Sequence, residues 1–489
     1  MFTGCLTIVS ISDSNHHDKA QEASEDYPRE ACGVVGVYSR SEDVARVAFF
    51  GLYALQHRGQ ESAGIAVGDG ETIRVKTSMG LVGQAFQEDE LSTLTGHISI
   101  GHTRYSTTGS STLNNAQPIL SHGPDVTLAL AHNGNVINAM ALKQELAEWG
   151  CSFSSTNDSE IIAHLLSNAP ASNWQERVAY CMRRLEGAYS LTVMTKNELL
   201  GIRDPLGVRP LCIGKFQDGW VLASESCALD HIGAEFIRDV EPGEAVLIDE
   251  TGLRTIYKRD SATGRTASCM FEYIYFARPD SVLGGKLVYS TRMAMGAELA
   301  KEFAVDADIV IGVPDSAIAA AVGYSQESGI PFGEGLVKNR YVGRTFIQPD
   351  QRMRELGVRR KLNTLPELIK DKRIIVVDDS IVRGTTTPHV VGLLKKGGAK
   401  EIHLRICAPP IVSPCHFGVD MATRKELIAA NMSVDEIRDF VGADSLGYLS
   451  HEGLLRAVKI SKTSVCMACF TGEYPIPVQL EMDKLALEV

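Results

Sequence analysis

The stretch "RIIVVDDSIVRGTTT" (residues 373–387) constrains the fold more than any other part of the sequence. Its apolar residues Ile374–Val377 are typical of a buried strand, and two adjacent carboxylates, Asp378 and Asp379, follow at the carboxyl end. Ligands collect at that edge of open parallel sheets. Gly384 permits a tight turn, and hydroxyls and amides at the start of a helix bind anions. Four residues can supply them: Ser380, Thr385, Thr386 and Thr387. The stretch predicts an anion site, against the alternative of an exposed turn with an ordinary helix cap.

The pattern on either side of this stretch indicates a parallel sheet. "ADIVIGVPDS" and "EIHLRICAPP" are further apolar runs bounded by charge or proline, and helical segments such as "TTPHVVGLLKKGG" separate the three runs. Strands that alternate with helices predict βαβ units. We therefore expect residues 263–489 to form an α/β domain.

The region from Cys32 to about Asp260 has a different pattern. Short strand-like runs such as "GVVGVYS" and "GWVLASES" dominate, with Gly-rich turns, and two helical patterns interrupt them. This predicts an α+β domain over residues 32–262, followed by a polar linker, "YKRDSATGRTAS". A chain of 489 residues is long enough for two such domains.

Composition excludes several classes of function. The net charge of −12 argues against a general nucleic-acid surface. No apolar run approaches the roughly 20 residues that a membrane span needs, so we expect a cytoplasmic protein without a membrane partner. Residues 1–31 are polar and acidic, which predicts a disordered leader rather than a secretory signal. Eleven cysteines in such a chain favour metal binding or catalysis over disulfides.

The second half carries a resemblance to type I phosphoribosyltransferases. The 373–387 stretch resembles their fingerprint for phosphoribosyl pyrophosphate (PRPP), which implies that Asp378 and Asp379 face the ribose and a metal while the Gly/Thr loop holds the 5-phosphate. "VIGVPDSA" looks like the family's pyrophosphate loop. The resemblance implies that Ser316 joins the two aspartates near the metal, and such hard oxygen ligands suit Mg²⁺.

Between these motifs lies a basic segment, Lys338–Lys361, in an otherwise acidic protein. One interpretation is a solvent-exposed basic loop. The other is a lid that closes over the pyrophosphate and excludes water. In the second interpretation Lys338 and Arg340 contact the phosphates.

Four ordered stretches of the first half resemble the class II glutamine amidotransferases, which have the N-terminal-nucleophile fold with its αββα layers. These stretches are "LQHRGQESAGI", "GHTRYSTTG", "AHNGNV" and "TNDSEII", and all follow Cys32. The resemblance implies that residues 1–31 are a propeptide and that Cys32 becomes the N-terminal nucleophile. An α-amino group has a pKa of about 8 and can accept the proton of its own thiol.

The same resemblance assigns roles to four other residues. The Asn133 side chain and the Gly134 amide would stabilise the oxyanion. Arg104 would bind the α-carboxylate of glutamine, and Asp158 its α-ammonium group. Three histidines near these motifs invite a Cys–His interpretation, but we interpret them as structural because the amine already supplies a base: His57, His102 and His132.

A glutaminase of this kind followed by such a phosphoribosyltransferase resembles the amidophosphoribosyltransferase family. The stretch "FEYIYFARPDS" at the junction adds to the resemblance. It implies an enzyme that makes 5-phosphoribosylamine, pyrophosphate and glutamate from glutamine and PRPP, opening purine (IMP) synthesis. It also implies a homotetramer inhibited by purine nucleotides. Glucosamine-phosphate synthase and asparagine synthetase lack the PRPP motif. A non-catalytic PRPP-sensing regulator is the alternative, and it would need a DNA-binding extension.

Four cysteines carry the last expectation: Cys269, Cys415, Cys466 and Cys469. A CxxC pair alone is consistent with a redox pair, zinc or an iron–sulfur centre. Cys407 could compete as a ligand, although it lies inside an apolar strand-like run and we interpret it as core. The family resemblance implies one 4Fe-4S cluster and one Mg²⁺ per subunit. The remaining cysteines are expected to be structural: Cys5, Cys151, Cys181, Cys212 and Cys227.

Overall fold

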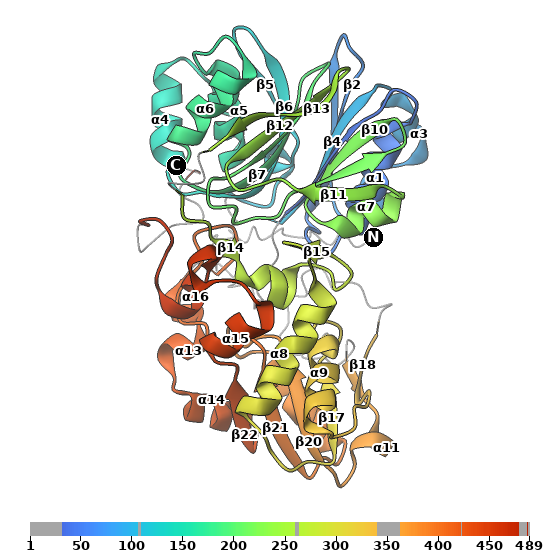
Figure 1. Cartoon of the computed structure of the whole chain (residues 1–489), viewed down its shortest axis with the longest axis vertical. Helices are drawn as coiled ribbons and strands as arrows, with labels where there is room; N and C mark the ends of the chain where they lie inside the picture. The colour runs from blue at the N-terminus through green and yellow to red at the C-terminus, as the bar shows by residue number, and fades with distance from the viewer. Residues whose placement is uncertain are drawn as a thin grey trace, which may run out of the picture.

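The computed structural model describes residues 32–105, 109–259, 264–339, 362–421, 423–478 and 487. Two halves follow one another along the longest axis of the molecule, with the strand-rich N-terminal half above and the second half below (Figure 1). No helix in these ranges is both long and apolar enough to cross a bilayer.

The first half contains two antiparallel sheets. The seven-stranded sheet has the order β11-β9-β10-β1-β4-β2-β3. Its strands are β1 (Gly33–Tyr38), β2 (Ser62–Gly68), β3 (Ile73–Met79), β4 (Ile98–Arg104), β9 (Cys212–Phe216), β10 (Gly219–Ala223) and β11 (Glu235–Asp239). The six-stranded sheet has the order β13-β12-β8-β7-β6-β5. Its strands are β5 (Ile119–His122), β6 (Thr127–Val136), β7 (Gly187–Met194), β8 (Leu199–Arg203), β12 (Glu244–Asp249) and β13 (Gly252–Lys258).

Helices cover the outer faces of both sheets (Figure 1). Those on the first sheet are α1 (Val44–Ala54), α2 (Val82–Ala85), α3 (Glu88–Thr93) and α7 (Ser226–Ile232). Those on the second are α4 (Ala139–Glu148), α5 (Asp158–Asn168) and α6 (Trp174–Arg184), and the 3-10 turn η1 spans Leu113–Asn115.

The strands are buried on both faces because each sheet packs against helices on one side and against the other sheet on the other. In β1, Val34 lies in the core between the sheets, whereas Val35 lies in the core under α1. Successive strand residues point to opposite faces. The αββα arrangement predicted for this half is therefore confirmed.

The second half is built on a four-stranded parallel sheet with the order β17-β20-β21-β22. Its strands are β17 (Ile309–Gly312), β20 (Arg373–Asp378), β21 (Glu401–Ile406) and β22 (Ser445–Tyr448). One face packs on α8 (Val288–Glu302), α9 (Ile318–Ser328) and α15 (His451–Val458). The other packs on α12 (Thr387–Lys396), α13 (Ile428–Asn431) and α14 (Val434–Val441). The parallel sheet is as predicted.

The sheet has one strand more than the three apolar runs predicted, because β22 pairs with β21 at the edge of the sheet. The sequence does not predict this strand because its four residues, "SLGY", include a serine and a glycine. Its backbone pairs with β21 all the same.

Short elements complete the second half. The hairpin β18 (Leu336–Lys338) and β19 (Leu362–Thr364) brackets residues 340–361, which lie outside the described residues, so the predicted basic lid is described only at its first two positions. The others are β15 (Val282–Leu283), β16 (Lys286–Leu287), α11 (Pro366–Ile369), η4 (Arg424–Glu426) and η5 (Lys462–Ser464).

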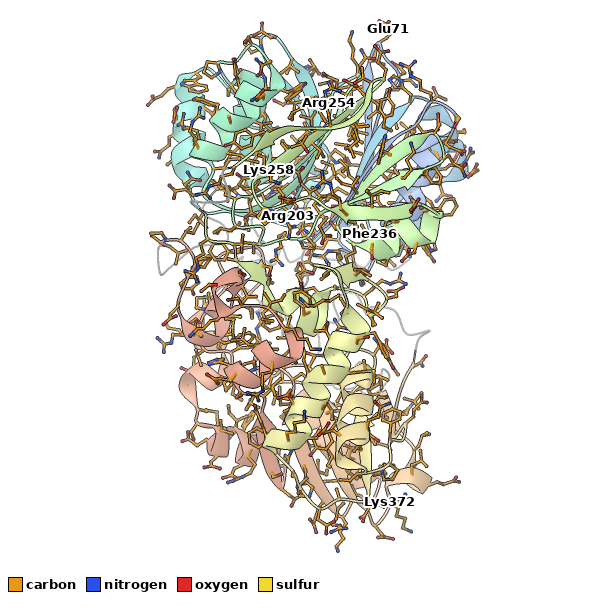
Figure 2. All side chains as sticks on the ribbon, in the orientation of Figure 1. Glu71, Arg203, Phe236, Arg254, Lys258 and Lys372 are labelled. Atoms are coloured by element: carbon orange, nitrogen blue, oxygen red, sulfur yellow. The ribbon has the colours of Figure 1, made fainter. Side chains whose placement is uncertain are left out.

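The junction between the halves is made by segments from distant parts of the chain. There β14 (Ser268–Cys269) pairs in parallel with β23 (Val465–Cys466), flanked by the π-helical turn η3 (Glu272–Phe276) and by α16 (Ala468–Thr471). Arg203 lies at the edge of the first half that faces the junction (Figure 2) and donates to the carbonyls of Gly207 and Arg209, at 2.9 and 2.8 Å. It thereby supports the loop that carries Arg209 toward the second half.

The close approach of α8 and α9 gives a stability prediction. An ideal Cβ at Gly296 would lie 1.8 Å from the carbonyl oxygen of Ala320, so Gly296→Ala must push the helices apart. We expect a loss of about 1–3 kcal/mol in the free energy of unfolding. Gly392→Ala in α12 is the matched control, because nothing lies within 4 Å of its Cβ position. It should stabilise by about 0.5–1 kcal/mol. Equal midpoints in urea unfolding would contradict the prediction.

Candidate functional site

Cys32 lies directly before β1, which is the strand between β4 and β10 in the first sheet. Its side chain is 7% exposed. The thiol donates to the carbonyl of Tyr105 at 3.3 Å, and the Tyr105 N–H approaches Sγ at 3.5 Å. Cys32 precedes Val34 by two residues and so shares its face, which is the one between the two sheets. The cysteine therefore faces the second sheet.

The thiol is protonated at neutral pH. Burial raises the pKa of the Cys32 thiol above its usual value, and the hydrogen bond with Tyr105 and the charge of Arg104 offset only part of that rise. A nucleophilic thiolate at this position therefore requires a nearby base.

Among the described residues, none of the three neighbouring histidines is hydrogen-bonded to the Cys32 thiol. The Nε2 atom of His102 lies 3.0 Å from the His132 carbonyl, and Nδ1 of His132 lies 3.1 Å from the Ser159 hydroxyl. His57 pairs with Glu225 at 2.8 Å. Burial lowers the pKa of His102 to about 3, so its ring is neutral at pH 7. These contacts favour the structural interpretation of all three.

Asn133 lies on β6, in the second sheet, and is fully buried. It follows Ala129 and Ala131, which belong to the core between the sheets, at intervals of two residues. Its side chain thus faces the same space as Cys32. Within the described ranges neither its Oδ1 nor its Nδ2 atom has a hydrogen-bond partner. A buried amide without a partner is costly to keep and points to a ligand that completes it.

Gly134 follows with a backbone angle φ of +150°. A Cβ there would lie 2.0 Å from the carbonyl oxygen of Ala188, so only glycine fits between β6 and β7. A loop of the second half also comes close, because a Cβ on Gly418 would lie 2.9 Å from the Gly134 carbonyl carbon. Asn135 reinforces this contact by donating to the His416 carbonyl at 2.9 Å.

Arg104 and Asp158 are buried near this space. Arg104 ends β4 and lies 3.7 Å from Glu61, while its guanidinium donates to the Ser110 carbonyl at 3.2 Å. Asp158 begins α5 and accepts from the Val136 N–H at 3.0 Å. Burial alone would raise the pKa of Asp158, but the ring of His132 and the Val136 N–H lower it below the usual value, so the carboxylate is ionised at neutral pH. Arg104 and Asp158 thus place opposite charges near Cys32.

The second site lies at the carboxyl edge of the parallel sheet. Asp378 ends β20, and Asp379 and Ser380 follow, all of them buried. The Ser380 hydroxyl donates to Asp379 at 2.6 Å. The Ser316 hydroxyl, from the loop between β17 and α9, donates to the other oxygen of Asp379. The fold therefore brings Ser316 to Asp379, the second of the two adjacent acids.

The Gly/Thr loop leads from these acids into α12. Gly384 has a left-handed φ of +71°, and Thr387 is the first residue of the helix, preceded by Thr385 and Thr386. The ammonium of Lys338, at the end of β18, lies 2.9 Å from the Asp315 carboxylate. This ion pair brings the first residue of the basic segment to the loop after β17. Arg340 lies outside the described residues.

The four cysteines of the expected cluster gather at the junction. Cys269 and Cys466 are register partners in β14 and β23. Burial raises the pKa of Cys466 to about 12, and the neighbouring thiols Cys269 and Cys415 add to the rise. Burial and the other three thiols likewise raise the pKa of Cys469. The thiol of Cys407 interacts with Asp379 and Asp378 instead. Cys407 therefore belongs to the environment of the acid pair.

The four cysteines form a possible donor set. They are half-buried, and their thiols interact electrostatically with one another. Four cysteines are the ligand set that structural zinc sites and 4Fe-4S clusters share. In the described part of the chain, no group of three or more His, Cys, Asp or Glu side chains is arranged to hold a metal ion.

Two buried charged residues close to Cys32 were not identified from the sequence. Arg58 and Glu272 lie inside the quoted stretches "LQHRGQESAGI" and "FEYIYFARPDS", yet neither received a role. Arg58 is 1% exposed and donates to the Cys32 carbonyl at 3.1 Å. The sequence did contain one sign of a buried charge at this position, because Glu272 is the single carboxylate within the apolar run "CMFEYIYF".

Comparison with known proteins agrees with this geometry. A family model for a glutamine amidotransferase domain matches residues 102–231, and one for a phosphoribosyl transferase domain matches residues 292–410. The chain is 50% identical to the amidophosphoribosyltransferase of Synechococcus elongatus over 95% of each protein. It is 51% identical to that of Synechocystis over 100% of this chain and 99% of the other.

A solved structure is similar over the same extent. It is the glutamine PRPP amidotransferase from B. subtilis, complexed with ADP and GMP, at 45% identity with a TM-score of 0.86; the match covers 92% of this chain and 98% of that one. Fold and sites thus define a glutamine amidotransferase joined to a phosphoribosyltransferase. The chain belongs to the amidophosphoribosyltransferase family.

The Asn133 amide gives a prediction that separates stability from function. Asn133→Leu removes a buried polar group without partners, so the free energy of unfolding should rise by about 1–3 kcal/mol while glutamine hydrolysis is lost. Asn115→Leu is the control, because Asn115 is equally buried but bonds to Ser110 and Thr156. It should destabilise by a similar amount. Thermal unfolding of both variants checks the opposite signs, and a large loss in Asn133→Leu would contradict them.

Proposed function

We propose that this chain transfers ammonia from glutamine to PRPP, giving 5-phosphoribosylamine, pyrophosphate and glutamate, as the first step of purine synthesis. The observation that supports this most is the combination of two sites in one chain: a buried thiol facing an unpartnered amide, and an acid pair beside a Gly/Thr loop. Ammonia would pass internally between the sites, since in water it would be protonated or lost.

In the glutamine site we assign the nucleophile to Cys32, freed by removal of residues 1–31. Its α-amino group would accept the thiol proton, which agrees with the raised pKa of the buried thiol. The thiolate would attack the amide carbon of glutamine and form a C–S bond. The amide nitrogen would leave as ammonia with that proton, and water would hydrolyse the thioester to glutamate.

The other residues of this site would bind and stabilise. The unpartnered Nδ2 of Asn133 and the N–H of Gly134 would donate to the oxyanion of the tetrahedral intermediate. Arg104 would hold the α-carboxylate of glutamine and Asp158 its α-ammonium group, as the buried opposite charges permit.

In the PRPP site, Asp378 and Asp379 would bind the ribose hydroxyls and favour the positive charge that develops on the ring. Ser380, Gly384 and Thr385–Thr387 would hold the 5-phosphate through amides and hydroxyls at the start of α12. Lys338, now paired with Asp315, and Arg340 would contact the pyrophosphate.

The oxygen donors of Ser316, Asp378 and Asp379 fit one Mg²⁺ per subunit, because Mg²⁺ prefers carboxylates and few protein ligands. When bound, it would neutralise the charge of the leaving pyrophosphate. The residues of this chain would keep the leaving group and the ribose in line.

We further propose that Cys269, Cys415, Cys466 and Cys469 hold one 4Fe-4S cluster per subunit. Their positions would let the cluster join β14, the 412–421 loop and the C-terminal segment, closing long loops whose entropy is otherwise costly. None of the four belongs to either reaction site, so the role would be structural.

We propose regulation from a solved relative and assembly from the family resemblance. The B. subtilis protein was solved with ADP and GMP. We propose that purine nucleotides inhibit this chain as products of its pathway, and that it forms a homotetramer in the cytoplasm.

The division of labour is tested by Cys32→Ala. Synthesis of 5-phosphoribosylamine from glutamine should fall by about 10³-fold or more, while synthesis from high concentrations of ammonia should persist. Asp378→Ala and Asp379→Ala should reduce both. The assay is pyrophosphate release with each nitrogen source. Equal loss of both activities in a folded Cys32→Ala protein would contradict the proposal.

The metal proposal is tested by Cys466→Ser in protein purified without oxygen. Iron, acid-labile sulfide and visible absorbance should fall from about four irons per chain to none, and the unfolding midpoint should drop, because ligand loss removes binding free energy that belongs to folding. Cys151→Ser, at a half-buried position in the first half, should keep full iron content. Stoichiometric zinc in the wild-type protein would overturn the cluster assignment.

A further inference from the structure

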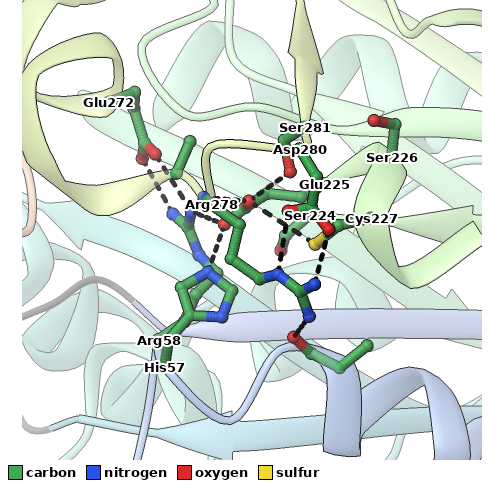
Figure 3. A network of polar contacts seen from close by, with 12 residues as sticks. His57, Arg58, Ser224, Glu225, Ser226, Cys227, Glu272, Arg278, Asp280 and Ser281 are labelled. Carbon is green, nitrogen blue, oxygen red and sulfur yellow. Dashed lines mark hydrogen bonds and ion pairs between the residues drawn. The ribbon is translucent and has the colours of Figure 1, made fainter. Parts of the chain in front are cut away.

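A cluster of buried charges lies between Cys32 and the second half of the chain. The guanidinium of Arg58 binds two carboxylates. Its Nη1 lies 2.6 Å from Glu225, and its Nη1 and Nη2 lie 2.9 and 2.8 Å from the two oxygens of Glu272. Figure 3 shows both carboxylates converging on Arg58, with His57 beside it. The third nitrogen, Nε, donates to the Cys32 carbonyl at 3.1 Å.

The two carboxylates come from different halves. Glu225 caps α7 of the first half, whereas Glu272 begins η3, three residues after Cys269. Arg209 approaches Glu272 at 3.1 Å and also donates to the Phe417 carbonyl at 2.9 Å. Glu272 is thus held between two arginines of the first half.

The cluster consists of four residues that are all ionised and that each have a partner of opposite charge: Arg58, Arg209, Glu225 and Glu272. Burial alone would raise the pKa of Glu272, but Arg58 and Arg209 lower it below the usual value. His57 and Arg58 likewise hold the pKa of Glu225 far below its usual value despite burial. Two arginines balance two glutamates, which is the condition for keeping charges away from water. Loss of one carboxylate leaves an uncompensated cation beside Cys32.

The geometry at Arg58 does more than balance charge. A guanidinium is planar, and a carboxylate that binds two of its nitrogens fixes the orientation of the plane. Here Glu272 fixes the edge that carries Nη1 and Nη2, so the direction of the Nε–H bond follows. That bond ends on the carbonyl of Cys32, whose peptide plane sets where the thiol and the α-amino group lie.

The backbone of η3 is itself restrained. Arg292 of α8 donates to the carbonyls of Tyr273 and Tyr275 at 3.0 and 2.9 Å, and to that of Ala277 at 2.7 Å. Glu272 therefore projects from a turn that the second half holds rigidly.

We infer that Glu272 is a positioning residue for the glutaminase reaction: through Arg58 it orients the nucleophile Cys32 from the other half of the chain. The inference rests on the proposed function, in which Cys32 attacks glutamine. Residues 32–259 then contain every group that touches glutamine but lack one support of the nucleophile. Productive geometry at Cys32 requires the second half to be docked.

The test compares Glu272→Gln and Arg58→Lys with wild type in the full-length protein. Glutamine and ammonia serve in turn as nitrogen source. In both variants, kcat with glutamine should fall by about 100-fold, the loss expected for a misplaced reacting group. KM for glutamine should stay within about two-fold, because Arg104 and Asp158 are intact, and the ammonia-dependent rate should not change. Intact mass must show that each chain tested begins at Cys32.

Two controls distinguish positioning from a structural role. Lys143→Met removes another bond between the halves, the one from Nζ to the Leu487 carbonyl at 2.9 Å, without contacting the cluster. It should leave both rates unchanged. Arg58→Lys keeps the positive charge but loses the planar fork, so charge balance alone predicts near wild-type activity, whereas positioning predicts the same loss as Glu272→Gln.

Several results would overturn the inference. These are a glutamine-dependent kcat within about two-fold of wild type in either variant, an equal loss with ammonia, or a loss expressed only in KM. If Glu272→Gln does not fold, Arg58→Lys decides in the same assay. Wild-type protein that makes 5-phosphoribosylamine from neither nitrogen source would instead refute the proposed function, before any variant is compared.

Discussion

Pairing of buried charges at the junction is the interaction on which the rest of this molecule depends. Arg58 and Arg209 extend from the first half without access to water, and Glu272 of the second half is their shared partner. A separated first half would leave both cations with less compensation than folding requires. The same contacts end on the carbonyls of Cys32 and Phe417, so docking of the halves and geometry of the nucleophile are parts of one arrangement.

The two reaction sites use different means to keep reactive groups ready. In the first half, strand alternation points Cys32 and Asn133 into the space between the sheets, and the Asn133 amide is left without a protein partner. A buried amide without a partner lowers stability, and under the proposed function that cost provides a preorganised donor. In the second half, the acids stand where parallel strands end, and a serine from the neighbouring loop already hydrogen-bonds to Asp379. The hydroxyls of Ser316 and Ser380 donate hydrogen bonds to Asp379, so the polar groups of this site have protein partners.

The loop that carries Cys415 connects the cysteine group to the glutamine site. Two residues after Cys415, Phe417 accepts from Arg209, and Gly418 packs against Gly134 with no room for a side chain. Whatever holds the cysteine group therefore also supports the backbone at Gly134. This contact gives the C-terminal region a physical link to the first half, along with Leu487, which packs into the core beneath α4–α6.

Much of the fold could be predicted from the sequence. The apolar run before Asp378 and Asp379 and the glycine that follows predicted the parallel sheet and an anion loop at its edge. The ordered motifs after Cys32 predicted the αββα layers and a set of candidate site residues, but only through their resemblance to a known family. The strand β22 was missed because four residues with a serine and a glycine show no periodicity. Tertiary structure alone decided that Arg58 meets Glu272, 214 residues further along the chain. Periodicity reports which face a side chain occupies, but the partner across that face depends on how all the layers pack together.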